Sequence, residues 1–329
     1  MIKAAMFDAK PYDRPGFERF LSGKDIKLKV FETKLNEDTA ELSHGYDAVI
    51  AFVNDDISRG VIDILCEKNV RLIAMRCAGF NNIDVKYALG KIPIVRVPDY
   101  SPYAVAEHAA AMLLTSIRRI HKAYIRTKDF NFSLNGLIGF DLHGKTVGVV
   151  GTGKIGRCFI DICRGFGMNV IAYDPYPVAD SGIEYVSLDE LFRRSNIISL
   201  HCPLTAETNH LVNEETIAKM KTGVVIINTS RGALIDTDAL LNGIKSKRIG
   251  AACLDVYEEE SDIFFEDYSG HIVQDDTLAR LTTMPNVLIT SHQAFLTEEA
   301  LNNIAETTIN NITSFFESGE LKNEVKYRQ

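Results

Sequence analysis

Short runs of apolar, mostly β-branched residues alternate along this chain with segments whose apolar positions recur at helical spacing. Such runs between polar turns are typical of buried strands, and a period near 3.6 residues is typical of amphipathic helices. Because the runs are continuous and alternate with helical segments, we expect parallel sheets covered by helices on both faces. The pattern predicts eleven strands, at residues 2–7, 28–30, 48–52, 72–75, 94–97, 146–150, 169–173, 197–200, 224–227, 250–254 and 287–290.

Two α/β units, each a doubly wound parallel sheet, are expected because eleven strands are many for a single open sheet. The clearest internal boundary lies at residues 98–102, where two prolines bracket a turn before a long apolar helix. Ser187, Asn213 and Thr297 each stand where a side chain can cap the start of a helix. The helix that starts at Thr297 follows the last strand of the second unit, and we expect it to return to the first. This predicts a discontinuous first domain and a continuous second one, at residues 1–100 with 298–329 and residues 101–297.

Composition and charge exclude several classes of protein. Of the 329 residues, 46% are hydrophobic and 24% are charged, as in ordinary globular domains, so disorder, collagen and coiled coil are excluded. The formal net charge is −8, and the acidic segment 258–276 contains no lysine or arginine, which makes a nucleic-acid backbone a poor partner. The most apolar stretch, 104–117, contains Glu107 and His108 and is too short to cross a bilayer. We therefore expect neither a nucleic acid nor a membrane as a partner.

The cysteines indicate a reducing compartment. Six of them are spread along the chain without a CxxC pair, and no signal peptide follows Met1. We expect reduced thiols in a cytoplasmic protein, and no residue cluster predicts a metal site.

A glycine-rich turn follows the sixth predicted strand. Its residues form an uninterrupted GxGxxG, Gly151-Thr152-Gly153-Lys154-Ile155-Gly156. A helical pattern follows this turn, and then a second strand that ends at Asp174. Gly151 permits the tight bend, Gly153 lets the backbone approach a pyrophosphate, and Gly156 allows close packing of the helix. Asp174 lies 18 residues beyond Gly156, where a carboxylate accepts hydrogen bonds from the adenosine ribose and repels a 2′-phosphate. The pattern predicts NAD rather than NADP, with a simple turn carboxylate as the alternative for Asp174.

Three polar residues, Arg231, Glu260 and His292, each follow a different predicted strand of the second unit, at the end where doubly wound sheets bind ligands. Arg231 can present a planar fork of donors to a substrate carboxylate. His292 can donate a proton to a developing alkoxide. Glu260, bonded to the other ring nitrogen, would orient the ring and stabilise the imidazolium. Together they suit the reduction of a ketone by hydride from a nicotinamide.

Each of these residues also has a purely structural interpretation, as a surface ion-pair partner, a member of the acidic segment or a buried histidine. His201 also ends a predicted strand, but its own motif has no arginine or carboxylate, so we interpret it as lining the cofactor pocket. The other six histidines lie on predicted helices or loops without such neighbours. Chemistry alone does not separate Glu260 from Glu258 or Glu259.

Several motifs spread over nearly the whole length carry a family resemblance, at residues 76–82, 101–102, 106–108, 151–156, 201–205, 228–232, 255–258 and 291–295. Together they are far more specific than the glycine turn. The chain resembles the D-specific 2-hydroxyacid dehydrogenase family and, within it, the bacterial D-lactate dehydrogenases. The resemblance implies a Rossmann-type NAD domain, a flavodoxin-like substrate domain with a cleft between them, and a homodimer or homotetramer.

The resemblance also implies roles for individual residues. Arg231 would bind the substrate, His292 would donate and accept the proton, and Glu260 would be its partner because the family places this acid five residues after Asp255. Around the cofactor it places Gly151, Gly153, Lys154, Ile155, Gly156, Asp174, Cys202, Pro203, Thr208, Thr229, Ser230 and Asp255. Around the substrate it places Arg231 and His292, the backbone N–H groups of Ala78 and Gly79, and the side chains of Tyr100 and Phe52. Phe52 has a core residue as its alternative interpretation, since it ends an apolar strand.

These inferences predict reversible hydride transfer from NADH to C2 of pyruvate, which gives D-lactate. Two alternatives stay open: reduction of a bulkier 2-keto acid, and a non-catalytic NAD sensor like the corepressors that resemble this family. Phosphoglycerate oxidation is disfavoured because the chain ends soon after its predicted final helix. Formate oxidation is disfavoured because a carboxylate rather than an amide is expected beside the histidine.

Overall fold

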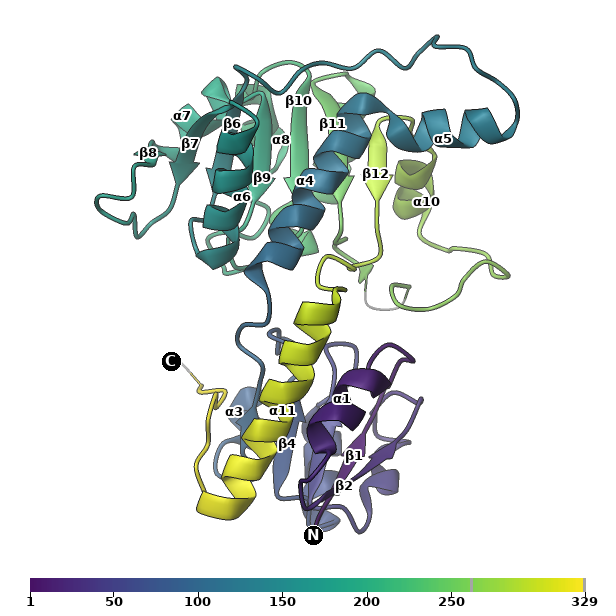
Figure 1. The fold of residues 1–329 in the computed structure, drawn as a ribbon, viewed down its shortest axis with the longest axis vertical. Coiled ribbons are helices and arrows are strands. Elements are labelled where there is room, and N and C mark those ends of the chain that lie inside the picture. The colour runs from purple at the N-terminus through teal and green to yellow at the C-terminus, as the bar shows by residue number, and fades with distance from the viewer. Residues whose placement is uncertain (261–262, 328–329) are drawn as a thin grey trace. The chain divides into compact units, whose positions relative to one another are not determined.

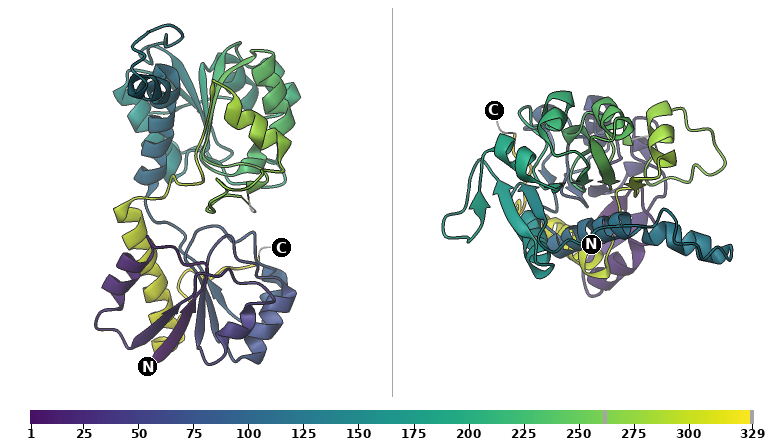
Figure 2. Two further views of the ribbon diagram at one scale, coloured as in Figure 1. Left: turned by 90° about the vertical axis from the view of Figure 1, so that its right-hand side faces the viewer. Right: turned by 90° about the horizontal axis from the view of Figure 1, so that it is seen from above.

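The computed structural model describes residues 1–260 and 263–327. Asp262 of the acidic segment and residues 328–329 of the expected first domain lie outside the described residues. The chain divides into two compact units: unit 1 comprises Met1–Ser101 and Leu296–Gln329, and unit 2 comprises Pro102–Phe295. Each unit is a parallel sheet with helices on both faces (Figure 1, Figure 2).

Unit 1 is built on a five-stranded parallel sheet in the order β2-β1-β3-β4-β5. This order is the flavodoxin-like one, in which ligands bind at the carboxyl ends of the strands. The strands are β1 (Ile2–Met6), β2 (Ile26–Val30), β3 (Ala48–Ala51), β4 (Leu72–Met75) and β5 (Ile94–Val95). The helices are α1 (Arg14–Leu21), α2 (Arg59–Glu67), α3 (Val85–Ala88) and α11 (Glu298–Ser318), with a 3-10 turn at Ala40–Ser43.

The last helix of the chain, α11, packs on the sheet of unit 1 beside α1 (Figure 1). Thr297 caps its first turn with a side-chain oxygen, as the sequence predicts. Ala305, Ile309 and Ile312 of this helix are buried in the same apolar cluster as Ile50 of β3. The chain therefore begins and ends in the same unit.

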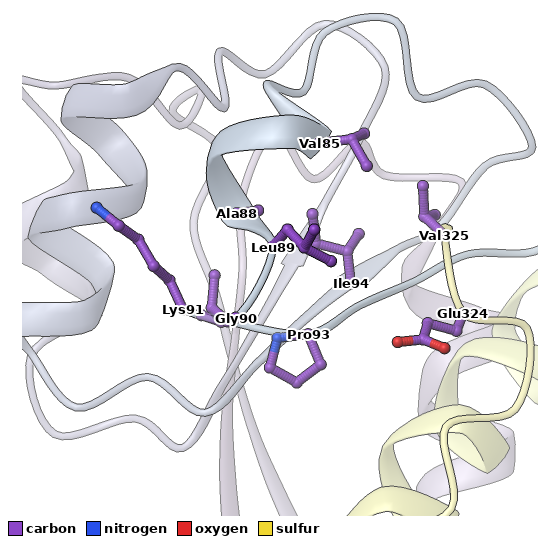
Figure 3. A pocket seen from close by; sticks show the side chains of 10 residues that line it. Val85, Ala88, Leu89, Gly90, Lys91, Pro93, Ile94, Glu324 and Val325 are labelled. Atoms are coloured by element: carbon purple, nitrogen blue, oxygen red, sulfur yellow. The ribbon is translucent and has the colours of Figure 1, made fainter. Parts of the chain in front are cut away.

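The residues after α11 run along the edge of this sheet. The Val325 N–H donates to the Ile94 carbonyl at 2.9 Å, and the Arg96 N–H donates to the Asn323 carbonyl at 3.1 Å. A short antiparallel stretch thus extends the sheet beyond β5. Figure 3 shows the pocket beside this stretch, which residues of the α3–β5 connection such as Leu89 line together with Val325.

Unit 2 is built on a seven-stranded parallel sheet in the order β12-β11-β10-β9-β6-β7-β8. Its strands are β6 (Thr146–Val150), β7 (Asn169–Tyr173), β8 (Glu184–Tyr185), β9 (Ile197–Leu200), β10 (Val224–Asn228), β11 (Ile249–Leu254) and β12 (Val287–Ile289). One face is covered by α4 (Pro102–Arg118) and α6 (Lys154–Gly165), and the other by α7 (Leu188–Arg194), α8 (Glu214–Lys219), α9 (Thr237–Lys245) and α10 (Asp276–Thr283). After α4 comes α5 (Ile120–Lys128), which buries none of its residues. Among the helices of the described residues, none reaches the length and hydropathy of a membrane span.

The doubly wound parallel sheets predicted from the sequence are confirmed. Neighbouring residues of one strand enter two different cores: Ile226 packs under α7 to α10, and Ile227 packs under α4 and α6. Burial on both faces explains why these strands are continuous apolar runs. Within the described residues the pattern missed β8, because two residues carry no periodic signal. The predicted caps Ser187 and Asn213 are confirmed, since each side chain accepts a backbone N–H of the helix that it begins.

Candidate active site

The turn between β6 and α6 requires glycine at two positions for steric reasons. Gly151 has a φ of +94°, and a Cβ there would lie 2.6 Å from the carbonyl oxygen of His201. A Cβ at Gly156 would lie 2.1 Å from the carbonyl oxygen of Gly151. Gly153 differs, because a Cβ there would meet nothing within 4 Å among the described residues. This open space lies at the N-terminus of α6, where backbone N–H groups can bind a pyrophosphate.

Asp174 follows β7 and lies against this turn. Its Oδ2 accepts hydrogen bonds from the Thr152 N–H at 2.7 Å and the Thr152 hydroxyl at 2.9 Å, and its Oδ1 accepts the Tyr176 N–H at 2.9 Å. Burial alone would raise the pKa of this carboxyl, but the hydrogen bonds outweigh burial and hold the pKa below its ordinary value. A carboxylate that stays ionised disfavours a 2′-phosphate. These contacts support the interpretation of Asp174 as a turn carboxylate, and its ribose contact stays a prediction.

Two further residues predicted to line the cofactor are a buried threonine and a partly buried cysteine. Thr229 is 7% exposed, and its hydroxyl has no hydrogen-bond partner among the described residues. An unpaired buried hydroxyl is costly unless a ligand completes it. Burial raises the pKa of the Cys202 thiol to about 11, so Cys202 is a neutral, weakly polar wall at neutral pH. Together with the open space at Gly153, these residues fit a bound dinucleotide.

Other predicted cofactor residues are used by the protein itself. The Ser230 hydroxyl donates to the Leu200 carbonyl at 2.8 Å, and the Thr208 hydroxyl donates to the Pro203 carbonyl at 2.7 Å. These bonds shape the loops after β10 and β9. Lys154 and Ile155 are the first two residues of α6, directly after the glycine turn. Their contacts with a cofactor stay predictions.

Glu260 and His292 form a hydrogen-bonded pair. The Nδ1 of His292 lies 2.9 Å from Oε1 of Glu260, and the Tyr257 N–H donates to the other carboxylate oxygen at 3.0 Å. Because a carboxylate only accepts, Nδ1 carries a proton, and Nε2 is the nitrogen that can exchange a proton with a ligand. The structure thus places the third of the three consecutive glutamates beside the histidine. Glu258 instead lies 2.5 Å from Nε2 of His210.

Asp255, directly after β11, holds the loop that carries His292. Its backbone carbonyl accepts the His292 N–H at 2.7 Å, and its carboxylate oxygens accept the N–H groups of Gln293 and Ala294 at 2.9 and 2.8 Å. His292 has a φ of +52°, a left-handed conformation that its surroundings must enforce. Asp255 is fully buried. Its observed contacts fix the histidine loop, and its contact with the cofactor stays a prediction.

Two histidines that the sequence pattern left without acidic neighbours do have them. The Nε2 of His108, on α4, lies 3.3 Å from Oδ1 of Asp255 and 3.2 Å from the hydroxyl of Thr290. Burial alone would raise the pKa of Asp255, but bonds from His108, Thr290 and the backbone lower it overall. His210 pairs with Glu258, as described above. The prediction was wrong because the packing of helices on strands joins residues that are far apart in the sequence.

His201 is neutral and internal to unit 2. Its Nε2 lies 2.8 Å from the Ser199 hydroxyl, and its ring packs on Phe159 with the ring centroids 5.1 Å apart. Burial lowers the pKa of His201 to about 4, so its ring is uncharged at neutral pH and is not available there as an imidazolium acid. These contacts favour His292 over His201 as the acid.

Arg231 follows β10, the neighbour of β11 in the sheet. Its Nη1 donates to the Ser230 carbonyl at 2.7 Å. A Cβ at the next residue, Gly232, would lie 2.0 Å from the Tyr257 carbonyl oxygen, so the Arg231 loop lies directly against the segment that leads to Glu260. The parallel strands β10, β11 and β12 therefore bring a guanidinium, a carboxylate and an imidazole to one rim of unit 2.

The predicted substrate residues of unit 1 follow the carboxyl ends of its strands. Phe52 is 4% exposed, and the Arg76 guanidinium lies 4.1 Å from the centroid of its ring, which favours the interpretation of Phe52 as a core residue. Ala78 and Gly79 follow β4, and neither N–H has a hydrogen-bond partner among the described residues. Tyr100 comes after β5, and its carbonyl accepts a bond from the Asn303 amide at 2.6 Å. A substrate contact at each of these positions stays a prediction.

Two side chains that were not predicted as site residues, Arg76 and Phe265, contact residues that were. Arg76 is 2% exposed, and besides stacking on Phe52 it donates to the Asp8 carbonyl at 2.5 Å. The ring of Phe265, in the acidic segment, lies 5.7 Å from the ring of His292. The aromatic residues between the acidic ones are the sequence feature that indicates a buried face on this segment.

The comparison with known proteins identifies the family. The family model of the D-isomer specific 2-hydroxyacid dehydrogenase, NAD binding domain, matches residues 110–294, which lie within unit 2. The chain belongs to this family. The resemblance inferred from the motifs is thereby confirmed, and with it an NAD-dependent oxidoreductase.

Individual relatives cover nearly the whole chain. A 2-hydroxyacid dehydrogenase homolog of Haemophilus influenzae is 53% identical over 94% of this chain and 95% of that protein. The D-lactate dehydrogenase of Escherichia coli is 51% identical over 97% of this chain and 98% of that protein. Among solved structures, the pyruvate reductase of Chlamydomonas reinhardtii superposes with a TM-score of 0.93 at 43% identity over 98% of both chains.

Proposed function

We propose that this chain is an NAD-dependent D-lactate dehydrogenase that reversibly reduces pyruvate. The observation that carries the proposal is the hydrogen bond between Glu260 and His292, at the rim of the unit that contains the family's NAD-binding domain. The similarity over nearly full length to a D-lactate dehydrogenase and to a pyruvate reductase supports pyruvate as the substrate.

In this proposal the side chains of the protein transfer the proton and stabilise the charges that develop during the reaction. Bound NADH supplies a hydride to C2 of the keto acid. His292 donates a proton from Nε2 to the oxygen that becomes the hydroxyl, and it takes the proton back in the reverse direction. The Glu260 carboxylate at Nδ1 fixes the tautomer and stabilises the imidazolium, and the Tyr257 N–H keeps that carboxylate in place.

Substrate recognition is divided among side chains and backbone groups. Arg231 binds the substrate carboxylate with its planar fork and polarises the neighbouring carbonyl. The N–H groups of Ala78 and Gly79 bind the same carboxylate. The Tyr100 and Phe52 side chains limit the size of the keto-acid side chain that can bind.

The proposal is tested by the decay of NADH absorbance on addition of pyruvate, 2-ketoisocaproate or 3-phosphohydroxypyruvate, with kcat/KM compared across the three. We expect the highest kcat/KM with pyruvate, and oxidation of D-lactate but not of L-lactate in the reverse direction. A higher kcat/KM with 2-ketoisocaproate would assign a bulkier keto acid instead. The absence of reduction with every keto acid would refute the proposal.

We propose in addition that the chain forms a homo-oligomer, a dimer or a tetramer. Large apolar side chains are exposed on α5 and on the connection that follows it, which extends away from the sheet in Figure 1: Ile120, Tyr124, Ile125, Phe130, Phe132, Leu134, Ile138 and Phe140. An exposed apolar surface of this kind is typical of an interface, and a second copy is the simplest occupant. Light scattering should give a mass of at least two chains, and an aspartate at Ile125 should reduce it. A monomeric wild-type protein would contradict the proposal.

A cytoplasmic location is also proposed. No disulfide joins any of the six cysteines in the described part of the chain, and Cys77, Cys163 and Cys253 are buried. Free thiols persist where glutathione keeps them reduced. Cell fractionation should recover the protein with cytoplasmic markers, and recovery in an oxidising compartment would contradict this.

A further inference from the structure

The backbone of residues 77–79 carries two N–H groups whose direction is fixed by other residues of unit 1. Those of Ala78 and Gly79 are proposed above to bind the substrate carboxylate, and the present inference rests on that proposal. Each N–H shares a planar peptide unit with the carbonyl of the preceding residue. In a trans peptide these two groups point in opposite directions. Whatever holds the carbonyl of Cys77 or Ala78 therefore sets the direction of the N–H that follows it.

Both carbonyls are held by residues that follow β5. The Cys77 carbonyl accepts the Val97 N–H at 3.1 Å, and the Ala78 carbonyl accepts a hydrogen bond from Nη1 of Arg96 at 2.7 Å. The Arg96 guanidinium also lies 5.1 Å from the centroid of the Phe80 ring. The two N–H groups thus point away from residues 96–97, toward no acceptor among the described residues.

Arg96 is itself braced through its backbone. Its N–H donates to the Asn323 carbonyl at 3.1 Å, and its carbonyl accepts a bond from Nδ2 of Asn311 at 2.9 Å. Nδ2 of Asn323 in turn donates to Oδ1 of Asn311 at 2.9 Å. Asn311 lies on α11 and is 2% exposed. The C-terminal part of the chain therefore fixes the strand end from which the guanidinium reaches residues 78–80.

The usual partner of an arginine is a carboxylate, but Arg96 forms no ion pair with the described residues. Its hydrogen bond to a peptide carbonyl is charge-assisted and therefore short and strong. A cation on the carbonyl oxygen polarises the whole peptide unit, which makes the N–H on its other side a stronger donor. The unpaired positive charge also favours an anionic ligand beside it.

We propose that Arg96 is a positioning residue for substrate binding. It fixes and polarises the peptide between Ala78 and Gly79, so that the Gly79 N–H is aimed at the substrate carboxylate. Arg96 acts through the peptide and does not touch the substrate. Its contribution should therefore favour keto acids with a free carboxylate over the corresponding neutral esters.

The test compares pyruvate with methyl pyruvate as substrates of the full-length protein. Arg96→Met removes the donors and the charge but keeps an unbranched stem over Phe80. We expect the KM for pyruvate to rise about 10- to 100-fold, the range for loss of a hydrogen bond to a charged group. The KM for NADH and the rate with methyl pyruvate should stay within about twofold of wild type, because neither depends on carboxylate recognition. Arg96→Lys, which restores one charged donor, should recover part of the preference for pyruvate.

Arg59→Met is the matched control, because Arg59 is an exposed arginine of the same unit that bonds Asp84 at 2.8 Å. Its kinetics should equal those of wild type. Equal losses with pyruvate and methyl pyruvate in Arg96→Met, or no loss with either, would overturn the inference. If Arg96→Met does not fold, the ratio of the two substrates in Arg96→Lys decides: a ratio equal to that of wild type overturns the inference, and a reduced ratio supports it.

The failure of the proposed function would be visible separately, as a wild-type protein that reduces no keto acid. Hydrogen exchange at residues 77–80 then tests the bracing without any substrate. Faster exchange in Arg96→Met than in wild type and Arg59→Met supports the positioning role. Unchanged exchange overturns it.

Discussion

In unit 2 the polar groups proposed to bind or protonate the substrate are the side chains of Arg231 and His292, whereas in unit 1 they are the N–H groups of Ala78 and Gly79. Both sets follow the carboxyl ends of parallel strands. One member of each set, His292 in unit 2 and the Gly79 N–H in unit 1, is held by a charge that is not itself proposed to act on the substrate. In unit 2 this charge is the Asp255 carboxylate, which accepts N–H groups of the histidine loop, and in unit 1 it is the Arg96 guanidinium, which donates to a carbonyl.

This difference decides how each half can be altered. A side chain that acts directly can be removed by one substitution, and its loss should abolish a chemical step. A backbone N–H cannot be removed in this way, so only the group that aims it can be changed. We therefore expect large effects in unit 2 and graded effects on substrate affinity in unit 1.

The largest effect is expected for Arg231→Lys. An ammonium cannot reproduce the planar, two-pronged contact with a carboxylate, so kcat/KM for pyruvate should fall about 100- to 1,000-fold. The KM for NADH should change little. Steady-state kinetics measure both values, and near-wild-type kcat/KM would refute the role assigned to Arg231.

A smaller loss is expected for Asp255→Asn, which tests the orienting charge of unit 2. The N–H groups of Gln293 and Ala294 bond different oxygens of the carboxylate, and an amide replaces one of these oxygens with an NH2 donor, so one of the two bonds is lost. The histidine loop should shift, and kcat should fall about 10- to 100-fold. A kcat equal to that of wild type would show that other contacts fix His292.

The same substitution predicts a pH dependence of stability. The pKa of Asp255 is lowered in the folded protein, because bonds from His108, Thr290 and Ala294 outweigh its burial. Its contribution is therefore full above the unfolded pKa of about 3.9, and it is lost as the pH falls through the lower folded pKa. Urea unfolding of wild type and Asp255→Asn should give a difference in unfolding free energy that is constant near neutral pH and shrinks below about pH 4. A difference that grows on acidification would contradict this sign.

Glu260 and Glu258 provide a matched pair within unit 2. Glu260→Gln cannot stabilise the imidazolium, so pyruvate reduction should lose half of its kcat/KM at a lower pH than in wild type. Glu258→Gln alters only the partly exposed contacts with His210 and Thr237 and should change stability by about 1 kcal/mol or less, with an unchanged pH profile. The profile of kcat/KM from acid to alkaline pH measures both. An unmoved alkaline limb in Glu260→Gln would remove Glu260 as the partner of His292.

The smallest kinetic effect is expected for Asn311→Ala, which weakens the brace behind Arg96. The substitution leaves the Arg96 carbonyl and the Asn323 amide without their partner, so the free energy of unfolding should fall by about 1–3 kcal/mol. The KM for pyruvate should rise less than in Arg96→Met, because the guanidinium itself remains. A larger rise than in Arg96→Met would show that α11 acts by another route.

Some of this architecture follows from constraints that act within a few residues of each other. Strands buried on both faces need continuous apolar runs, so the two parallel sheets are visible in the pattern alone. The sharp turn at Gly151 and the close approach of Gly156 admit no Cβ, which is why the dinucleotide turn is equally visible. The family motifs added the proposed roles of Arg231 and His292.

Other features depend on which elements pack together. Three consecutive glutamates are equivalent along the chain, and the turn after Tyr257 decides that Glu260 reaches the histidine. The bond of His108 to Asp255 needs α4 to lie on β11. The contact of Arg96 with the Ala78 carbonyl needs β4 and β5 to be neighbours and residues 323–325 to lie beside β5. Apolar periodicity and glycine sterics are local, but a polar group takes its partner from whatever the folded chain places within about 3 Å, so these pairings were decided only in three dimensions.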